Sequence, residues 1–373
     1  MRIRFFAAAA AALICFSLLG GCAESADPSP LAGTTLTLPA DTVPTGTVPT
    51  ETVPTGAAPT ERPTEAVPTE AEQEPANYNR LTGEYDNPAG AASRAVGVML
   101  GNNKKSRPQI GIWNADLFLE AETEGGITRI MAVFADVSRI PDKLCPVRSA
   151  RSPFALIAQS LDLVYVHAGG SQEGLKTVKN AGLNSVNALT DGVTFWRDQG
   201  LKASRGTEYS LCTSGEKIAA RIQKRGWRTA SDRAPFTFGE PEGGTPCTRV
   251  QVTFSGSQTD SFLYDPETDL YTKYLGRLAN PTLHADAGGA ALQVANLLIL
   301  YDTKYAENQV TINFTLSSGE GVLISGGRSR TVRWTRTAKG LTVTENGAPA
   351  LFSPGKTYIC LVSKSNKSAT VLE

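Results

Sequence analysis

The sequence predicts an α+β fold overall, with an α/β N-terminal globular domain at residues 90–233 and a mainly β C-terminal domain at residues 235–365. In the first part, short apolar runs alternate with stretches of helical spacing, which is typical of a sheet covered by helices. In the second part, apolar and polar residues alternate with period two between turn-forming pairs. About 290 residues follow an unusual N-terminal region, enough for one large domain or two ordinary ones.

The first part contains short apolar runs that we expect to be strands, at residues 96–100, 130–134 and 163–167. Residues 153–161 have helical spacing and lie between the second and third runs. Residues 174–181 form a second expected helix, which Gly182 ends as a C-terminal cap. This alternation favours a sheet with helices on its faces.

The expected strands of the second part are separated by turns. They lie at residues 250–254, 261–264, 270–274, 297–301, 331–335, 341–344 and 358–362. Asp265-Pro266-Glu267-Thr268 has the turn chemistry to join two of them into a hairpin. Gly326-Gly327 and Asn346-Gly347 mark further turns. Residues 297–301 are entirely apolar, which indicates a buried strand.

Residues 1–22 have the layout of a lipoprotein signal peptide with a lipobox. Arg2 and Arg4 give a basic start, residues 5–19 are mainly apolar, and Gly20-Gly21 precede Cys22. The apolar run is shorter than the roughly 20 residues that span a membrane. We expect a diacylglycerol anchor on Cys22, which would hold the chain at the outer face of the cytoplasmic membrane. An ordinary cleaved signal and an uncleaved anchor are the alternatives.

Residues 23–77 are expected to be a disordered Thr/Pro-rich tether. Copies of Thr-Val-Pro-Thr begin at Thr42, Thr47 and Thr52, and large apolar residues are scarce. Such a segment cannot bury enough apolar surface to offset the entropy of ordering it. Fully extended, it would reach on the order of 150 Å from the membrane. The composition also suits O-glycosylation.

Composition excludes several classes of function. The formal net charge is zero, so nucleic acid is not an expected partner. His167 and His284 are the chain's two histidines and no CxxC pair occurs, so neither a metal nor a cofactor is expected. We expect one disulfide at most, with free thiols as the alternative, among Cys145, Cys212, Cys247 and Cys360.

Polar residues gather near the expected strand ends of the first part. They are Asn102, Arg107, Glu120, Glu124, Arg129, Arg148, Arg151, His167, Gly169, Gly170, Ser171, Trp196 and Arg197. Arginine guanidinium groups match carboxylates and phosphates. Gly169-Gly170 permit close backbone approach, and Ser171 is expected to cap a helix whose N-terminus favours an anion. We therefore expect an anion-binding site at this edge of the sheet.

Several of these residues also have a purely structural interpretation. Ser171 is equally suited to capping its helix alone, and Arg148 and Arg151 to pairing with nearby carboxylates. His167 suits a hydrogen-bonded core position, and Trp196 suits packing. A binding site is favoured because so many polar residues fall near the same strand ends, and no single residue would indicate a site by itself.

Several separated blocks resemble the YerB family of bacterial lipoproteins. They are residues 96–99 with Asn102, 107–111, 115–116, 124–129, 146–151 and 167–171, followed by 295–299 and 319–321 in the second part. The chain departs at Cys145, where the family usually has glycine. The resemblance implies an extracytoplasmic location, two domains and one site for the polar blocks. It implies no reaction, because none is assigned to the family's domains.

Three functions fit these observations. The first is binding of an anionic cell-envelope component, such as a wall glycan, a phosphate polymer or a peptide carboxylate, by Arg129, Arg148 and Arg151. The second is a scaffold that docks another exported protein through exposed strand edges. The third is an envelope hydrolase in which His167 works with Glu120 or Glu124. Nucleophile and metal motifs are missing, and His284-Ala285-Asp286 is expected to be a surface turn, so catalysis ranks last.

Overall fold

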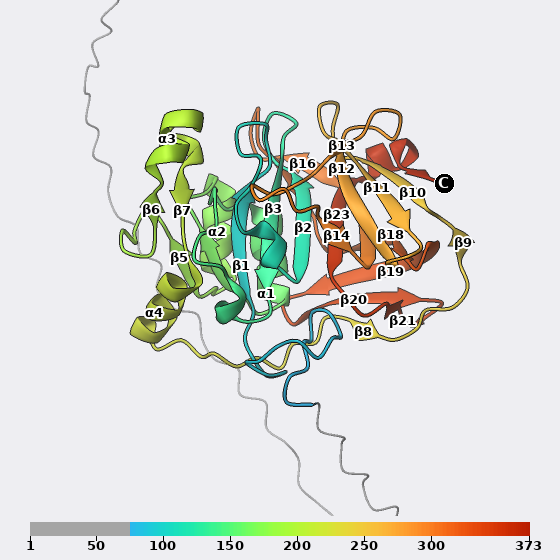
Figure 1. Cartoon of the computed structure of the whole chain (residues 1–373), viewed down its shortest axis with the longest axis horizontal. Coiled ribbons are helices and arrows are strands. Elements are labelled where there is room, and N and C mark those ends of the chain that lie inside the picture. The colour runs from blue at the N-terminus through green and yellow to red at the C-terminus, as the bar shows by residue number, and fades with distance from the viewer. Residues whose placement is uncertain (1–74) are drawn as a thin grey trace, which may run out of the picture. The chain divides into compact units, whose positions relative to one another are not determined.

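A computed structural model describes residues 75–373 (Figure 1). The signal peptide, Cys22 and all but the last three residues of the predicted tether lie outside the described residues. Residues 75–78 already form a turn, in which the amide of Tyr78 donates to the carbonyl of Pro75 at 3.0 Å. None of the helices in residues 75–373 has the length and hydropathy of a membrane span.

Residues 75–373 contain four α-helices and four short 3-10 helices. The α-helices are α1 (Ser152–Ser160), α2 (Gln172–Asn180), α3 (Gln199–Arg205) and α4 (Gly215–Arg225). The 3-10 helices are η1 (Ile112–Asn114), η2 (Val137–Arg139), η3 (Thr207–Tyr209) and η4 (Lys364–Ala369). α1 and α2 confirm the two predicted helices. α4 was not predicted, because Ile218 and Ile222 are its only large apolar residues among charged ones.

Within residues 75–373, the largest sheet has twelve strands. In spatial order they are β21 (Ala348–Pro349), β20 (Gly340–Glu345), β19 (Arg328–Thr337), β18 (Ser318–Ser325), β15 (Asn296–Asp302), β23 (Thr357–Ser363), β2 (Leu117–Glu122), β3 (Thr128–Phe134), β1 (Val96–Gly101), β4 (Val164–His167) and β5 (Ser185–Asn187), with β9 (Thr245–Pro246) beside β19. β2 and β23 pair in parallel, from Leu117 opposite Thr357 to Ala121 opposite Leu361. The sheet therefore runs without a break from the first part of the chain into the second (Figure 1).

A second sheet of six strands belongs entirely to the C-terminal part. Its strands are β13 (Thr282–Leu283), β12 (Leu270–Leu275), β11 (Thr259–Asp265), β10 (Arg249–Thr253) and β24 (Val371–Leu372), with β14 (Gln293–Val294) beside β12. Three two-stranded pairs complete the fold. They are β16 (Lys304–Ala306) with β17 (Ile312–Phe314), β22 (Leu351–Phe352) with β8 (Thr237–Phe238), and β6 (Trp196–Arg197) with β7 (Leu211–Cys212).

The large sheet is buried on both faces. On one face, Leu119 and Ile359 join a core cluster with Phe154 of α1. On the other face, the ring of Tyr358 lies 5.5 Å from Phe118 and 5.4 Å from Phe262 of the second sheet, measured between centroids. Successive side chains of β2 and β23 therefore enter different cores, because neighbouring residues of a strand point to opposite faces of the sheet.

The predicted α+β fold class is confirmed, with the α-helices of residues 75–373 confined to the first part and strands dominating the second. The domain boundaries at residues 90–233 and 235–365 remain a prediction, and the large sheet contains strands from both sides of residue 234. β2 was not predicted, because Glu120 and Glu122 interrupt its apolar run. Both glutamates are nonetheless buried.

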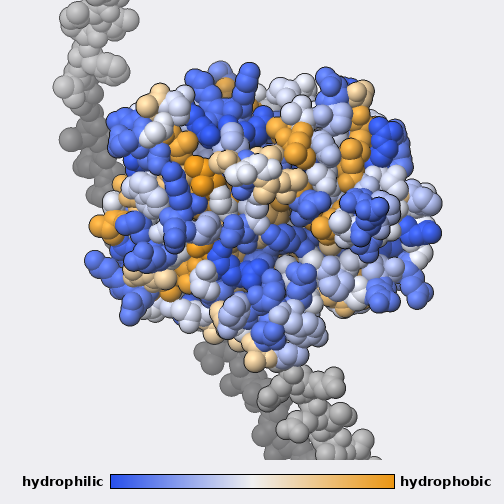
Figure 2. All heavy atoms as spheres, viewed as in Figure 1, coloured by the Kyte–Doolittle hydropathy of each residue, from blue (hydrophilic) through white to orange (hydrophobic). Residues whose placement is uncertain are grey.

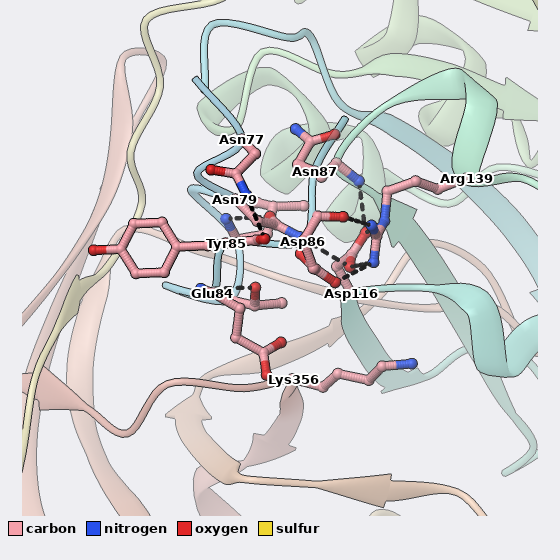
Figure 3. Close-up of polar contacts among 12 residues, drawn as sticks. Asn77, Asn79, Glu84, Tyr85, Asp86, Asn87, Asp116, Arg139 and Lys356 are labelled. Carbon is pink, nitrogen blue, oxygen red and sulfur yellow. Dashed lines mark hydrogen bonds and ion pairs between the residues drawn. The ribbon is translucent and has the colours of Figure 1, made fainter. Parts of the chain in front are cut away.

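The N-terminal end of the described chain is fastened to the body by a buried carboxylate (Figure 3). Asp116, fully buried, accepts from Asn79 at 3.1 Å and from two nitrogens of Arg139 at 2.7 and 3.0 Å. Arg139 also donates to Asp86 at 2.8 Å. Burial outweighs these bonds and raises the pKa of Asp116. These contacts therefore fasten residues 79–86 to the body of the protein.

Among the described cysteines, Cys145 and Cys212 form a disulfide that joins residues 67 apart in the sequence, while Cys247 and Cys360 are buried free thiols. The expectation of one disulfide at most is met. Trp196 and Leu201 pack against it, so the bond holds the β6–α3–β7 segment to the rest of the protein.

Removing this disulfide should lower the free energy of unfolding by about 3 kcal/mol, because the bond restricts a long loop of the unfolded chain. We expect dithiothreitol to reduce the urea midpoint of the natural protein. The double variant Cys145→Ala/Cys212→Ala should be equally unstable with and without dithiothreitol. An unchanged midpoint in the natural protein after verified reduction would contradict this role.

Candidate functional site

The structure separates the predicted site residues into three groups. Arg129, Arg151 and Glu124 meet beside the start of α2. Asn102 joins a buried network around Glu120. The remaining exposed cations lie around α3 and η3, together with residues that the sequence analysis did not select.

In the first group, one carboxylate holds two arginines. Oε1 of Glu124 accepts a hydrogen bond from Nη2 of Arg129. Its Oε2 accepts from Nε and Nη2 of Arg151, at 3.0 and 2.7 Å. The arginine side chains are 3% and 9% exposed, against 25% for Glu124. Burial, followed by repulsion from Arg151, lowers the pKa of Arg129 to about 9. Arg129 and Arg151, two of the predicted ligand-binding arginines, therefore already hold an anion that belongs to the protein.

The predicted helix N-terminus is also occupied. Ser171 caps α2 by accepting from the Gly174 amide at 3.1 Å, as expected. The Glu173 amide donates to Glu307 at 2.9 Å, and Asn313 donates to the same carboxylate at 3.0 Å. Burial alone would raise the pKa of Glu307, but these bonds lower it. Glu307 comes from the loop between β16 and β17, so the C-terminal part supplies the anion.

The two predicted glycines serve the backbone here. Gly169 has φ of 65°, and its carbonyl accepts from the Ala150 amide at 2.9 Å. Gly170 pairs with Ala150 in an isolated parallel bridge. A Cβ on Gly170 would lie 3.2 Å from the Ala150 carbonyl oxygen, so the close approach of these two segments favours glycine.

His167 lies in the core at 1% exposure. Its Nδ1 bonds the Gly169 carbonyl and its Nε2 bonds the Ser185 hydroxyl, each at 2.7 Å. Burial lowers its pKa, although the Gly169 bond opposes that shift. Both ring nitrogens are thus engaged away from Glu120 and Glu124, and this geometry gives no support to the hydrolase interpretation.

His284 corrects the expected surface turn. Asp286 does cap a turn, accepting from the Gly288 amide at 2.7 Å, but His284 is 1% exposed. Its Nε2 bonds Gln109 at 3.1 Å, and its ring meets Trp113 edge-on at 5.4 Å between centroids. Although both residues of β13 are exposed, the amide of His284 donates to the carbonyl of Lys273 in β12 at 3.1 Å, which holds the histidine against the buried part of the sheet.

Cations from the loop after β1, the segment before α1, β6 and α3 lie near η3; Lys104, Lys105, Arg197 and Lys202 are exposed, whereas Arg148 and Arg205 are half-buried. We define the basic surface as Lys104, Lys105, Arg148, Arg197, Lys202 and Arg205. Figure 2 shows mostly hydrophilic side chains around α3, at the upper left of Figure 1. The members Arg148 and Arg197 were predicted site residues, whereas the lysine pair and α3 were missed. The adjacent lysines directly after a strand were the signal that could have found it.

Tyr209 of η3 organises the basic surface. Arg148 lies over its ring at 5.1 Å and Lys105 at 6.0 Å, and Arg148 donates to Glu208 at 2.5 Å. Such cation–π contacts hold guanidinium and ammonium groups near one another despite their like charge. Arg205 donates to the Pro108 carbonyl at 2.8 Å and so ties α3 to the loop after β1.

Two predicted members border this surface without joining it. Trp196 is half-buried against the disulfide, with the Lys217 ammonium 5.9 Å from its ring centroid. Arg107 is half-buried, and its Nη1 has no hydrogen-bond partner within residues 75–373.

Neither a metal centre nor an exposed sheet edge stands out in the described chain. Within residues 75–373, no three His, Cys, Asp or Glu side chains are grouped as a metal site would need. The large sheet ends in β21 and β5, of two and three residues, which leaves little edge for strand addition. A cavity of about 390 Å³ lies between Arg233, Lys339 and Phe352, outside the predicted site.

The variant Glu124→Gln should destabilise the protein by about 3 kcal/mol, because it leaves two nearly buried arginines without a counter-charge. Glu208→Gln is the matched control, since it also removes one carboxylate from an arginine but at 65% exposure. We expect the control to cost less than about 1 kcal/mol in chemical denaturation. Equal losses in both variants would contradict the assigned role of Glu124.

Acidification should weaken the fold through His167. Its folded-state pKa is below the unfolded value, so its contribution is complete above about pH 6.5 and is lost as pH falls below that value. His167→Gln keeps a hydrogen-bonding side chain and should flatten the dependence of unfolding free energy on pH, by at most about 1.4 kcal/mol per pH unit. Parallel curves for the two proteins between pH 6.5 and 5 would refute this.

Known proteins place the chain in a family. Residues 81–228 match the N-terminal domain, and residues 250–359 the C-terminal domain, described as protein of unknown function DUF3048. The relative named "Putative lipoprotein YerB" from Bacillus subtilis (strain 168) is 27% identical over 279 residues, covering 72% of this chain and 81% of the relative. A crystal structure of YerB from Bacillus subtilis matches with a TM-score of 0.69 at 26% identity, covering 79% of this chain and 98% of that one. The YerB resemblance is thereby confirmed, and because the two domain matches span more than half of its length, the chain belongs to the DUF3048 family.

Proposed function

We propose that this protein is a membrane-anchored extracytoplasmic lipoprotein that binds an anionic phosphate polymer of the cell envelope through its basic surface. The observation that supports this most is that Lys105 and Arg148 both lie over the ring of Tyr209, while Arg205 of α3 is tied to the same loop after β1, in a chain whose formal net charge is zero. A local excess of one sign attracts a partner of the other sign.

The acidic residues near the basic surface pair with other cations, so the lysines of this surface are free to bind a partner. Glu208 pairs with Arg148, and Asp198 pairs with Lys143 at 2.6 Å while capping α3. Lys104, Lys105 and Lys202 are exposed. By contrast, Arg129 and Arg151 hold Glu124, so the ligand surface proposed here lies outside the centre that the sequence indicated.

A polymer suits this surface better than a single small anion. The cations are mostly exposed and spread over several loops, an arrangement that matches repeated charges along a chain. The lipid anchor and tether predicted for residues 1–77 would let the surface search the envelope on the order of 150 Å from the membrane. A wall glycan without phosphate or a peptide carboxylate would carry fewer charges per length and bind more weakly.

The test measures retention on long-chain inorganic polyphosphate and on purified cell-wall material. The triple variant Lys104→Ala/Lys105→Ala/Arg197→Ala should bind at least about tenfold more weakly, and natural binding should weaken with added salt. The control Lys176→Ala/Lys179→Ala/Lys224→Ala makes the same change of charge on exposed positions of α2 and α4. Equal loss in both variants, or unchanged binding in the first, would overturn the proposal.

A further inference from the structure

A lysine and two carboxylates are enclosed between the two sheets. Lys273 of β12, Asp260 of β11 and Glu120 of β2 each have 0% exposure. Lys273 stands opposite Phe262 in the β11–β12 ladder, and Asp260 is two residues before Phe262, so the lysine and aspartate share one face. Charged side chains are almost never fully buried unless they are paired.

The lysine nitrogen is placed directly against the aspartate. Nζ of Lys273 contacts Oδ2 of Asp260 and lies 3.5 Å from Oε2 of Glu120. The rings of Phe262 and Tyr358 lie 5.6 and 5.3 Å from Nζ and enclose the pair. These aromatic walls exclude water, so an amide formed here would be shielded from hydrolysis.

The other oxygen of Asp260 is polarised by a neutral donor. Nε2 of Gln258 donates to Oδ1 of Asp260 at 2.6 Å. A donor in this position stabilises negative charge on the oxygen when a nucleophile attacks the carboxyl carbon. Burial, followed by repulsion from Glu120, raises the pKa of Asp260 to about 7, so the protonated, electrophilic form of this carboxyl group is accessible.

Glu120 is held as a proton acceptor. Its Oε1 accepts from Asn102 at 2.7 Å and from Thr128 at 2.5 Å, and its Oε2 accepts from Tyr358 at 2.5 Å. Burial alone would raise its pKa, but Lys273 and hydrogen bonds with Asp260, Thr128 and Tyr358 lower it. An ionised carboxylate beside both reacting groups can move a proton from the nitrogen to the departing oxygen.

We propose that Lys273 and Asp260 condense into an intramolecular amide bond, with Glu120 transferring the proton. The folded geometry holds nucleophile and electrophile together, which replaces a bimolecular encounter by an intramolecular one. Condensation also converts an ammonium and a carboxylate in a dry site into a neutral amide, and so removes the cost of keeping two charges out of water.

The reaction balances without an additional reagent. Burial alone would lower the pKa of Lys273, but attraction to Asp260 and Glu120 raises it, so the ammonium is the resting form. The reaction begins when Lys273 passes one proton to Asp260, giving a neutral amine and a carboxylic acid. Nζ then bonds to Cγ of Asp260, and negative charge develops on Oδ1 beside Gln258. Glu120 takes the second proton from Nζ and delivers it to the departing hydroxyl oxygen. The C–O bond breaks, one water leaves, the carbonyl re-forms, and Glu120 is again a carboxylate.

The amide bond would also form only after the two parts of the chain have packed together correctly. Lys273 and Asp260 belong to the second sheet, whereas Glu120 belongs to β2 in the first part of the chain. The proton carrier arrives only when the two parts have docked. The cross-link would then permanently fasten β11 to β12 at the interface with the large sheet.

Peptide mass spectrometry of the full-length protein tests the proposal. Because an acylated lysine is not cut by trypsin, residues 250–277 should remain one peptide that is lighter than its sequence by one water, about 18 Da. Further digestion with a glutamate-specific protease cuts after Glu267, and the two fragments should stay joined. A succinimide at an aspartate loses the same mass, but its fragments would separate. Normal cleavage after Lys273 with full sequence mass would overturn the proposal.

Point variants test whether Glu120 is the residue that transfers the proton. Glu120→Gln should be folded and uncross-linked, whereas Glu122→Gln, two residues along the same strand and paired with Lys304, should be cross-linked like the natural protein. Lys273→Arg keeps the charge and should remove the bond. If Glu120→Gln does not fold, Gln258→Ala is used and should cross-link more slowly after refolding. A complete bond in Glu120→Gln, or undiminished cross-linking rates in Gln258→Ala, would overturn the assigned roles.

Discussion

The parallel pairing of β2 with β23 is the constraint on which the rest of the structure depends. It joins a strand near the start of the folded chain to one near its end, and five residue pairs define its register. Both strands are buried along their whole length, so a shift by one residue would exchange every side chain between the two cores. Parallel pairing over this sequence distance also means that the large sheet is completed only after most of the chain has been made.

The same register decides where Glu120 lies. Its neighbours Leu119 and Ala121 enter the core beside α1, which places Glu120 on the opposite face, toward the second sheet. There it meets Tyr358, Lys273 and Asp260 rather than solvent. A carboxylate in this position is tolerable because donors from several elements satisfy it, and it thereby makes the contact between the two sheets specific.

Buried positive charges in the predicted site are likewise compensated by carboxylates of the protein itself. The arginines closest to the sheet, Arg129 and Arg151, are compensated by Glu124, and the α2 N-terminus is compensated by Glu307 from the C-terminal part. Buried cations and unsatisfied helix amides need an internal anion to be stable. The cations of the basic surface around α3, by contrast, are mostly exposed.

The sequence by itself determined the local elements and the chemistry of single positions. Continuous apolar runs identified β1 and β15, and helical spacing identified α1 and α2. The capping role of Ser171 followed from residue type, because all these features depend on neighbours along the chain. It also identified arginines near acidic partners, but not which partner each would take. Only the tertiary structure decided that Glu124 serves two arginines, that Glu307 fills the α2 N-terminus, and that Glu120 meets Lys273. These contacts join residues separated by tens to hundreds of positions, and their energies depend on burial that no local pattern encodes.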